Sequence, residues 1–525
     1  MPGRPLRPTR LGPALLAGAL GAGTPACTYD YLAAFEGSGG SPSTASSSTG
    51  TGAADGGGGP GGSTPVSECP GAQPGDPAPW LQVMGSKEEA ERTHAVVVDE
   101  QGAVYVGGVI AGDHEQGIFA GTQGDGTSDA FVAKLSASGE LVWRKRFGTL
   151  GSADGVLDMA TRAGVLLVSG TSDDGIVIDP AEPPIQGGWL ATLDTSDGST
   201  RWARALGAPT DHYPQAVAFG PTGDVIVGGR FKGTLVLGPS PALTATTAPT
   251  DLDAYVAVFE STGEARAVMW IQSDEADRIS DLTTDSDGFI YASGTLGNSG
   301  VTICSLHPTV ADGDALAVKL DPDAGCEGGW SNAIGGPLLQ MGLSIAVPDN
   351  NHVYLGGNFT GILRQNADVY AQTPPGTTDG FVMRLAAHDG NGSIPTAFGA
   401  VAADADDSSS CLAPTPDGVL AAGFFSKGAH LYEKAGGQAL GGAGGTDLFA
   451  MALDLGAGVL GFQRYGDAAD QWDPPGANQM RVVALPRGMI LAGSLRGNAT
   501  FDGMKAQSAG DSDAWVARLC LPPPL

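Results

Sequence analysis

One short segment recurs seven times along the chain and constrains the fold more than any other feature. It first occurs as DAFVAKL from Asp129 and returns as GGWLATL, DAYVAVF, DALAVKL, DGFVMRL, DLFAMAL and DAWVARL, with steps of 58, 66, 61, 65, 68 and 66 residues between starts. A segment that returns at a nearly fixed spacing is typical of repeat architectures. We therefore divide the chain by this repeat before interpreting any local motif.

Each full repeat contains four short runs in which apolar and polar residues alternate, and this alternation predicts β-strands. The first run is apolar, a turn with a glycine such as Gly102 follows, and the second run ends in two small residues such as Gly107-Gly108. The third run is the DAFVAKL segment. The fourth run carries a tryptophan in four repeats: Trp143, Trp202, Trp270 and Trp330. The 83 glycines and 36 prolines fit a chain of short strands and many turns.

Four antiparallel strands repeated around an axis are the blades of a β-propeller. Small residues at the end of the second run suit strands near the axis, where a Cβ would push neighbouring backbones apart. The seventh repeat lacks its fourth run, whereas residues 79–86 align with the fourth run of the first repeat, Trp80 over Trp143. We therefore predict an all-β, seven-bladed β-propeller of four-stranded antiparallel blades over residues 80–520, closed by an N-terminal strand that completes the last blade. Closure removes exposed sheet edges.

The repeats resemble the seven-bladed propeller repeat of the SBBP type found in secreted and cell-surface proteins of bacteria. VDEQGAVYVGG from Val98 and DAFVAKLSASGELVW from Asp129 match that pattern closely, and the other repeats match it more loosely, with Gly187 in place of the aspartate. The resemblance implies a propeller fold and a location outside the cytoplasm. It implies no reaction.

Residues 1–26 have the features of an export signal, because three arginines precede an apolar run too short to span a bilayer, and small residues precede Cys27. This N-terminus resembles that of a bacterial lipoprotein, which implies lipidation of Cys27 and a place at the outer membrane or cell surface. Ordinary secretion is the alternative. Residues 36–79 are rich in Gly, Ser, Thr and Pro and predict a flexible tether. The regions are thus a signal peptide (1–26), a lipidated cysteine and tether (27–79), the propeller (80–520) and a short tail (521–525).

The chain has six cysteines, and an exported chain can form disulfides. Cys69 precedes the N-terminal strand and Cys520 follows the last strand, so closure of the ring predicts a Cys69–Cys520 bridge. Cys304 and Cys326 flank the third run of one repeat and are the second predicted pair. Cys411 is then left over as a small buried residue of a first strand. No CxxC pair is present, which argues against zinc.

An aspartate begins most third runs, and several of these have an acidic companion nearby. As a metal site the candidates for calcium are Asp125, Asp129, Asp251, Asp253, Asp312, Asp314, Asp511 and Asp513. In the structural interpretation, which we favour, each aspartate accepts backbone N–H groups at the start of its strand. No calcium-loop motif is present, and we expect no other cofactor.

The net charge of −30 repels phosphate backbones, so nucleic acid is not an expected partner. No sequence motif of a catalytic site occurs, and the first strands look small and apolar, which favours a non-enzymatic role. We predict a monomeric binding module that takes a protein or glycan through the loops of one face. The alternatives are a propeller enzyme, such as a quinone-dependent dehydrogenase, a lyase or a glycosidase, and a purely structural envelope protein. An enzyme should converge polar side chains from several blades on an axial pocket, and a central cluster of His, Arg and carboxylates there would reverse this ranking.

Overall fold

The computed structural model describes residues 68–86, 91–114, 117–122, 128–148, 153–180, 182–207, 212–237, 243–246, 252–273, 276–297, 302–303, 313–323, 325–365, 368–373, 377–392, 395–400, 407–425, 429–431, 446–466, 480–508 and 512–524. Nearly all of the regular structure in these ranges is β-strand, with one short 3₁₀ helix, η2 (Gly117–Phe119). A search of the same ranges for a helix able to cross a membrane finds none.

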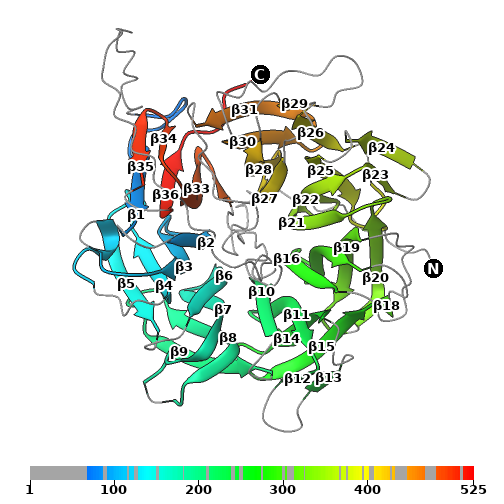
Figure 1. Ribbon diagram of the computed structural model, residues 1–525, viewed down its shortest axis with the longest axis horizontal. Helices are drawn as coiled ribbons and strands as arrows, with labels where there is room; N and C mark the ends of the chain where they lie inside the picture. The colour runs from blue at the N-terminus through cyan, green and yellow to red at the C-terminus, as the bar shows by residue number, and fades with distance from the viewer. Residues whose placement is uncertain are drawn as a thin grey trace, which may run out of the picture.

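The described residues form seven antiparallel sheets of four or five strands, set around a common centre (Figure 1). Sheet 1 has β2 (Arg92–Val98), β3 (Val104–Ile110), β4 (Asp129–Leu135) and β5 (Leu141–Phe147); sheet 2 has β6 (Asp154–Arg162), β7 (Val165–Ile176), β8 (Ile185–Asp194) and β9 (Thr200–Leu206); sheet 3 has β10 (His212–Phe219), β11 (Val225–Lys232), β14 (Leu252–Phe259), β15 (Ala265–Gln272) and β18 (Thr302–Ile303); sheet 4 has β16 (Arg278–Thr284), β17 (Ile290–Leu296), β19 (Asp314–Asp321) and β20 (Gly325–Ile334).

The remaining sheets continue this order around the centre. Sheet 5 has β21 (Gln340–Asp349), β22 (His352–Thr360), β25 (Thr378–Ala386), β26 (Thr396–Ala400) and β29 (Ala429–Leu431); sheet 6 has β27 (Ser408–Thr415), β28 (Gly418–Phe425), β30 (Asp447–Asp454) and β31 (Val459–Tyr465); sheet 7 has β32 (Arg481–Leu485), β33 (Gly488–Leu495), β36 (Asp513–Leu519) and β1 (Trp80–Met84). The first strands, β2, β6, β10, β16, β21, β27 and β32, lie nearest the centre, and we call them the inner strands (Figure 1).

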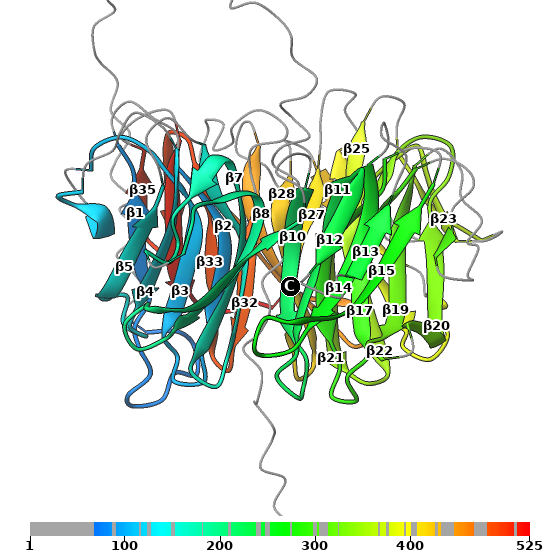
Figure 2. The same ribbon diagram turned by 90° about the horizontal axis from the view of Figure 1, so that it is seen from below.

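The antiparallel order gives the molecule two different ends (Figure 2). Tight turns join first to second and third to fourth strands at one end, the turn end. The connections from second to third strands, and from one sheet to the next, lie at the other, the connection end. Three of these connections form two-stranded hairpins: β12 (Thr234–Leu237) with β13 (Leu243–Thr246), β23 (Ile362–Gln365) with β24 (Asp368–Gln372), and β34 (Asn498–Phe501) with β35 (Met504–Gln507). Buried Leu235, Leu363 and Phe501 pack these hairpins onto the sheets.

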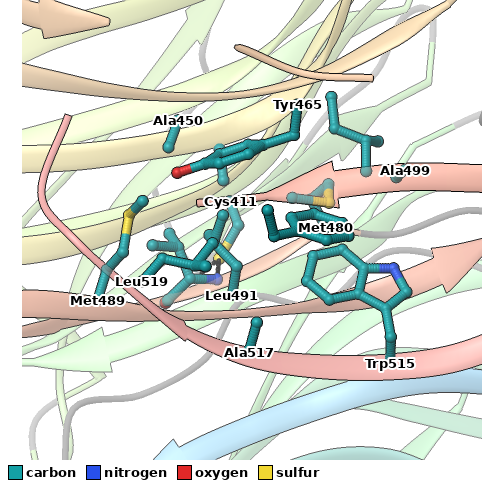
Figure 3. Packing of buried hydrophobic residues seen from close by; sticks show 14 of the residues in the cluster. Cys411, Ala450, Tyr465, Met480, Met489, Leu491, Ala499, Trp515, Ala517 and Leu519 are labelled. Carbon is teal, nitrogen blue, oxygen red and sulfur yellow. Dashed lines mark hydrogen bonds between the residues drawn. The ribbon is translucent and has the colours of Figure 1, made fainter. Parts of the chain in front are cut away.

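The hydrophobic core is divided into layers between neighbouring sheets. Each of seven clusters of buried side chains in the described residues draws its members from two consecutive sheets. Figure 3 shows the layer between sheets 6 and 7, where Tyr465 of β31 lies over Trp515 and Leu491 of sheet 7. The layer between sheet 7 and sheet 1 has the same character, with Trp80 and Val516 from one side and Phe131 from the other. The first and last sheets are therefore packed neighbours.

A tryptophan contact recurs between consecutive sheets. The indole N–H of Trp143 donates to the carbonyl of Thr195 at 3.1 Å, that of Trp202 to Ser261 at 3.0 Å, and that of Trp330 to Ala387 at 3.0 Å, each in the turn between the third and fourth strands of the next sheet. Each ring packs against a turn glycine of positive φ, and a Cβ on Gly198, Gly263 or Gly390 would come within 2.5–3.1 Å of it. Only glycine adopts this conformation cheaply and leaves the space for the indole.

Trp80 makes the same contact between sheets 7 and 1. Strand β1 pairs with β36 along its whole length, from Trp80 opposite Arg518 to Met84 opposite Ala514. The Trp80 indole donates to the carbonyl of Ala137 at 2.9 Å and lies against Gly139, whose φ of 83° is positive like that of the other turn glycines. Strand β1 thus takes the place that the fourth strand has in the other sheets.

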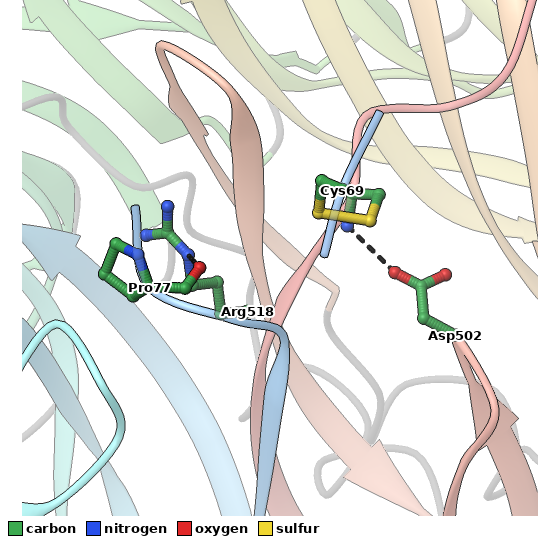
Figure 4. The surroundings of a disulfide bond; sticks show 5 residues. Cys69, Pro77, Asp502 and Arg518 are labelled. Atoms are coloured by element: carbon green, nitrogen blue, oxygen red, sulfur yellow. Dashed lines mark hydrogen bonds between the residues drawn. A yellow bond between two sulfur atoms is a disulfide. The ribbon is translucent and has the colours of Figure 1, made fainter. Parts of the chain in front are cut away.

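The cysteines support part of the predicted pairing. A disulfide joins Cys69 to Cys520, as predicted, and lies beside Asp502, which accepts the Cys520 N–H at 2.8 Å; Pro77 and Arg518 flank it (Figure 4). Cys326 and Cys411 are also disulfide-bonded. Cys411 is buried on an inner strand as expected, but the expectation that it is left unpaired is wrong. Cys304 lies outside the described residues, so Cys304–Cys326 stays a prediction, and Cys27 and the tether to residue 67 lie outside them too.

The contact of Trp80 predicts a matched pair of stability changes. Trp80→Ala removes a nearly buried indole and its hydrogen bond, so the free energy of unfolding should fall by about 3 kcal/mol. Trp270→Ala, in the fourth strand of sheet 3, removes an indole that is 38% exposed and should cost about 1 kcal/mol. Urea unfolding followed by tryptophan fluorescence measures both, and equal losses would contradict the role assigned to Trp80.

The disulfide predicts a second, independent loss. Cys69 and Cys520 are 451 residues apart, and a cross-link over so long a loop restricts the unfolded chain strongly. The double variant Cys69→Ser, Cys520→Ser should therefore lose about 6 kcal/mol of unfolding free energy in the chain-entropy model. Urea unfolding without reductant, compared with the parent chain, is the measurement, and an unchanged midpoint would refute it.

Candidate functional site on the inner strands

Six inner strands contain a β-bulge at the same place. The register shifts between Thr93 and Ala95, Val156 and Asp158, Tyr213 and Ala216, Ile279 and Asp281, Gly342 and Ser344, and Ser409 and Cys411. A bulge bends its strand and re-aims the side chains next to it. The residue after the shift lies opposite the first of the two small residues on the second strand. Together with Arg481, which is opposite Ala492, these residues define the inner positions: Ala95, Asp158, Ala216, Asp281, Ser344, Cys411 and Arg481.

Three inner positions carry ionisable side chains that are almost completely buried: Asp158, Asp281 and Arg481. The carboxylate of Asp158 accepts the backbone N–H of Val217 at 2.7 Å, and that of Asp281 accepts the N–H of Ile345 at 2.8 Å. Cys411 Sγ accepts the N–H of Val482 at 3.4 Å in the same way. In each case the donor is the backbone N–H of the residue directly after the inner position of the next sheet. These side chains therefore join neighbouring inner strands.

Arg481 and His94 continue this series from sheet 7 through sheet 1 to sheet 2. The Arg481 guanidinium donates from Nε to the carbonyl of His94 and from Nη1 to that of Met480 at 3.1 Å. His94, the bulge residue of β2, places its Nδ1 at 2.8 Å from the carbonyl of Val156. The first strands are expected from the sequence to be small and apolar, and the four buried ionisable residues Asp158, Asp281, Arg481 and His94 show that this expectation is wrong. The apolar pattern of the strands hides single polar positions that differ from repeat to repeat.

Burial controls the charge of this cluster. It raises the pKa of Asp158 and Asp281 well above the usual value, although the Arg481 charge and the backbone donors oppose the shift. Burial lowers the pKa of Arg481 to about 10, and the two carboxylates oppose it. Burial also lowers the pKa of His94 to about 3, so this imidazole is neutral at pH 7. The cluster therefore contains a buried guanidinium, and the carboxyl groups near it favour their protonated form.

The hydrogen bonds named above tie the cluster to the backbone of neighbouring strands. One exception is Asp158 Oδ1, which is buried without a hydrogen-bond partner in the described part of the chain. The hydroxyls of Ser169 and Ser293, opposite Asp158 and Asp281, are likewise buried and unpaired there. Buried polar atoms of this kind usually bind ordered water. The arrangement can hold the inner strands together and retain a few polar groups near the centre.

The recurring aspartates lie at the connection end, where each begins a third strand. Asp129, Asp253, Asp314, Asp379, Asp447 and Asp513 are all buried. A Cβ on Gly148, Gly335 or Gly85 would overlap the carboxylate of Asp129, Asp314 or Asp513, so each of these aspartates packs against a glycine that follows a fourth strand. Arg146 pairs with Asp129, and Arg464 lies 3.8 Å from Asp447. These contacts are with glycine and arginine residues, so acceptance of backbone N–H groups by these aspartates stays a prediction.

Only half of the candidate calcium ligands, the recurring aspartates, belong to the described residues. The companions Asp125, Asp251, Asp312 and Asp511 lie outside them. Where side chains are described, no group of three or more His, Cys, Asp or Glu residues could hold a metal ion. A calcium site that uses the companions therefore stays a prediction.

Sequence reasoning missed a second buried acid beside several of these aspartates. Its backbone N–H donates to the residue before the aspartate: Glu91 to Ser512, Asp154 to Ser128, Asp277 to Leu252, and Asp407 to Thr378, at 2.7–2.8 Å. The sequence feature that could have revealed these acids is an acidic residue at or just before the first strand in four repeats. Burial, reinforced by the neighbouring Asp513, raises the pKa of Glu91 to about 7, and burial with Asp253 nearby raises the pKa of Asp277 to about 7.

No family model matches the chain. The regulatory protein FlaEY of Caulobacter vibrioides is 23% identical over 403 residues, which are 70% of this chain and 40% of that protein. This chain therefore spans about two-fifths of the length of that relative.

Similar solved structures include quinohemoprotein alcohol dehydrogenases of Pseudomonas putida HK5 (TM-score 0.38, 10% identity) and Comamonas testosteroni (TM-score 0.33, 10% identity), each covering 85% of this chain and 77% of its own. A lignostilbene dioxygenase of Pseudomonas brassicacearum has a TM-score of 0.34 and 12% identity, and the match covers 85% of this chain and 92% of the dioxygenase. Likenesses this distant support no argument about activity.

The pKa of Glu91 predicts how stability depends on pH. Glu91 is buried 3.7 Å from His114, and its raised pKa means that the folded state holds the proton more tightly than the unfolded state does. This stabilisation is complete below about pH 4.5 and is lost as the pH rises through about 7. Asp277 acts in the same direction. Between pH 5 and 8 the unfolding free energy should fall, with Glu91 contributing on the order of 2 to 3 kcal/mol.

Glu91→Gln keeps the shape of the side chain and removes its titration, so the variant should show a flatter dependence. Urea unfolding at several pH values between 5 and 8 compares the two proteins. Parallel curves for parent and variant would exclude Glu91 as the source.

Proposed function

We propose that the chain is an exported, surface-tethered, seven-bladed β-propeller that acts as a non-enzymatic binding module. The ligand is a protein or a glycan, and the connection end receives it. No cofactor is required, and calcium is an optional ligand of the recurring aspartates. The protein works as a monomer.

Five observations support seven blades in a closed ring. Seven sheets surround one centre, and β1 pairs with β36 as the outermost strand of sheet 7. The hydrophobic layers include one between sheets 7 and 1, and Trp80 makes there the contact that tryptophans make between other sheets. The Cys69–Cys520 disulfide ties the two chain segments beside this pairing.

The bonding of the inner side chains carries the proposal of a non-enzymatic role. Asp158 and Asp281 bind backbone N–H groups of the next sheet, and Arg481 binds backbone carbonyls. A catalytic acid, base or electrophile must instead present its polar atoms to a substrate. These residues are almost completely buried and are used to join sheets. Binding is then left to the ends of the sheets, where loops on a rigid scaffold commonly carry function.

The export and anchoring of the protein are proposals that rest on the N-terminal sequence. Arg4, Arg7 and Arg10 before an apolar run, and small residues before Cys27, support a lipoprotein signal. The SBBP-like repeats support the same location outside the cytoplasm. The name of the FlaEY relative, a regulatory protein, specifies no reaction.

An enzyme is the second candidate, and one observation favours it. His94, Arg481 and two carboxylates gather near the centre, which is the arrangement expected of a propeller enzyme. Asp158 Oδ1 and its neighbour Ser169 also have buried polar atoms without partners among the described residues. Asp158→Asn tests this candidate, because a turnover found in a substrate screen should then fall by orders of magnitude if Asp158 takes part in chemistry.

The binding proposal predicts that exposed apolar residues on the connection hairpins affect partner capture. Val236 of β12 and Val369 of β24 are 44% and 62% exposed, and their replacement by aspartate should weaken capture of the partner at least about tenfold. Val142→Asp is the matched control, because Val142 is 53% exposed on β5 and belongs to no connection. The mature protein is used in a pull-down from envelope extracts and on a glycan array, with and without calcium.

Capture that Val142→Asp abolishes and the hairpin variants leave unchanged would refute the choice of face. Turnover of a substrate in the absence of any captured partner would refute the binding role and select the enzyme. The Cys27→Ala variant checks the anchor separately, since its release from the membrane fraction is expected only if Cys27 is lipidated.

A further inference from the structure

A cavity of about 320 Å³ opens at the turn end of sheet 5, opposite the connections discussed above. Its walls come from the β21–β22 turn, from the end of β25, and from the turn that follows β25. The lining groups that bear on a ligand are Asn351, His352, Arg384, His388 and Asn391. This volume is at the lower end of the range typical of small-molecule sites.

The walls of the cavity are held in place by their own turns. Asp349 Oδ1 accepts the backbone N–H groups of Asn351 and His352 at 2.8 and 2.9 Å, and Asp389 Oδ1 accepts that of Asn391 at 3.0 Å. Asn350, also in the lining, bonds Ser286 and Asp287 in the adjacent turn of sheet 4 at 2.8 and 2.9 Å. A site whose walls are fixed before binding loses little entropy when a ligand enters.

The lining chemistry fits a ligand rich in hydroxyl groups. Side-chain amides both donate and accept hydrogen bonds, a guanidinium donates, and an imidazole does either according to its tautomer. The side chains of Asn351, His352 and Arg384 supply all of these, and Asn391 adds its amide oxygen because its Nδ2 already donates to Asp389 Oδ2 at 2.6 Å. Ala386 is the single apolar side chain of the lining. A lipid or an aromatic ligand would find little apolar surface here. The vicinal hydroxyls of a sugar would each find a partner.

Charge decides between a neutral sugar and an acidic one. His352 Nδ1 lies 2.9 Å from Asp349, and His388 Nε2 lies 3.2 Å from Asp389, so each imidazole has a carboxylate beside it that offsets a positive charge. The Arg384 guanidinium already donates to the carbonyl of Leu455 at 3.2 Å. The whole protein carries a net charge of −30, which disfavours anions. We propose that this cavity binds an uncharged sugar residue, at a site separate from the connection end.

The experiment uses the mature protein and saturation-transfer NMR with the methyl glycosides of glucose, galactose, mannose and N-acetylglucosamine, with glucuronic acid as the anionic comparison. At least one neutral glycoside should bind. Asn351→Ala and His352→Ala should weaken it at least about tenfold, which corresponds to the loss of about one hydrogen bond. Asn498→Ala, an exposed asparagine of the β34–β35 hairpin, is the matched control and should leave binding unchanged.

The proposal is overturned if none of the neutral glycosides binds, if the pocket variants bind as the parent does, or if glucuronic acid binds more tightly. Circular dichroism of each variant confirms folding. The hairpin variants Val236→Asp and Val369→Asp should retain glycoside binding, so failure of this site and failure of the proposed connection-end function give different results.

Discussion

The pairing of β1 with β36 is the interaction on which the arrangement of the other sheets depends. It joins segments from opposite ends of the described chain, and the Cys69–Cys520 disulfide and the Trp80 contact lie beside it. Without β1, strand β36 would present an unpaired edge, and the layer between sheets 7 and 1 would lose Trp80 and Met84. Among the described residues, each hydrophobic layer joins two consecutive sheets, so an opening at this place would uncover one face of sheet 7 and one face of sheet 1. Covalent, hydrogen-bonded and hydrophobic contacts are therefore concentrated where sequence continuity is missing.

The strands and the order of the sheets could be predicted because they depend on residues that recur. The alternation in DAFVAKL fixes which side chains face a neighbouring sheet, and Trp80 shares its surroundings with Trp143, Trp202 and Trp330. The inner cluster could not be predicted, because Asp158, Asp281 and Arg481 occupy a position that is Ala, Ser or Cys in other repeats. Glu91 and Asp277 escaped notice for another reason: their effect comes from burial beside Asp513 and Asp253, which no spacing reveals.

At the inner positions, different side chains accept hydrogen bonds from equivalent backbone N–H groups. Near the centre, three of the N–H groups that follow an inner position face the previous sheet, and Asp158, Asp281 and Cys411 each supply an acceptor for one of them. The two aspartates are opposite Ser169 and Ser293, whereas Ala95, Ala216 and Ser344 are opposite glycine. The two carboxyl side chains thus occur with a second polar group on the adjacent strand, whereas Arg481 is opposite Ala492. Burying a carboxyl group is costly unless it is hydrogen-bonded or neutral, and here backbone donors and raised pKa values reduce that cost.

This use of the centre affects where ligands can bind. Residues that connect inner strands must keep their geometry for the sheets to stay packed, so substitutions there are constrained by stability before any question of activity. The two ends face a weaker constraint, because their turns and connections are held locally, as Asp349 and Asp389 hold the turns of sheet 5. A rigid centre also keeps the two ends at a fixed separation. The ligand proposed for the turn end and the partner proposed for the connection end would then not compete, because the two proposed sites share no residue.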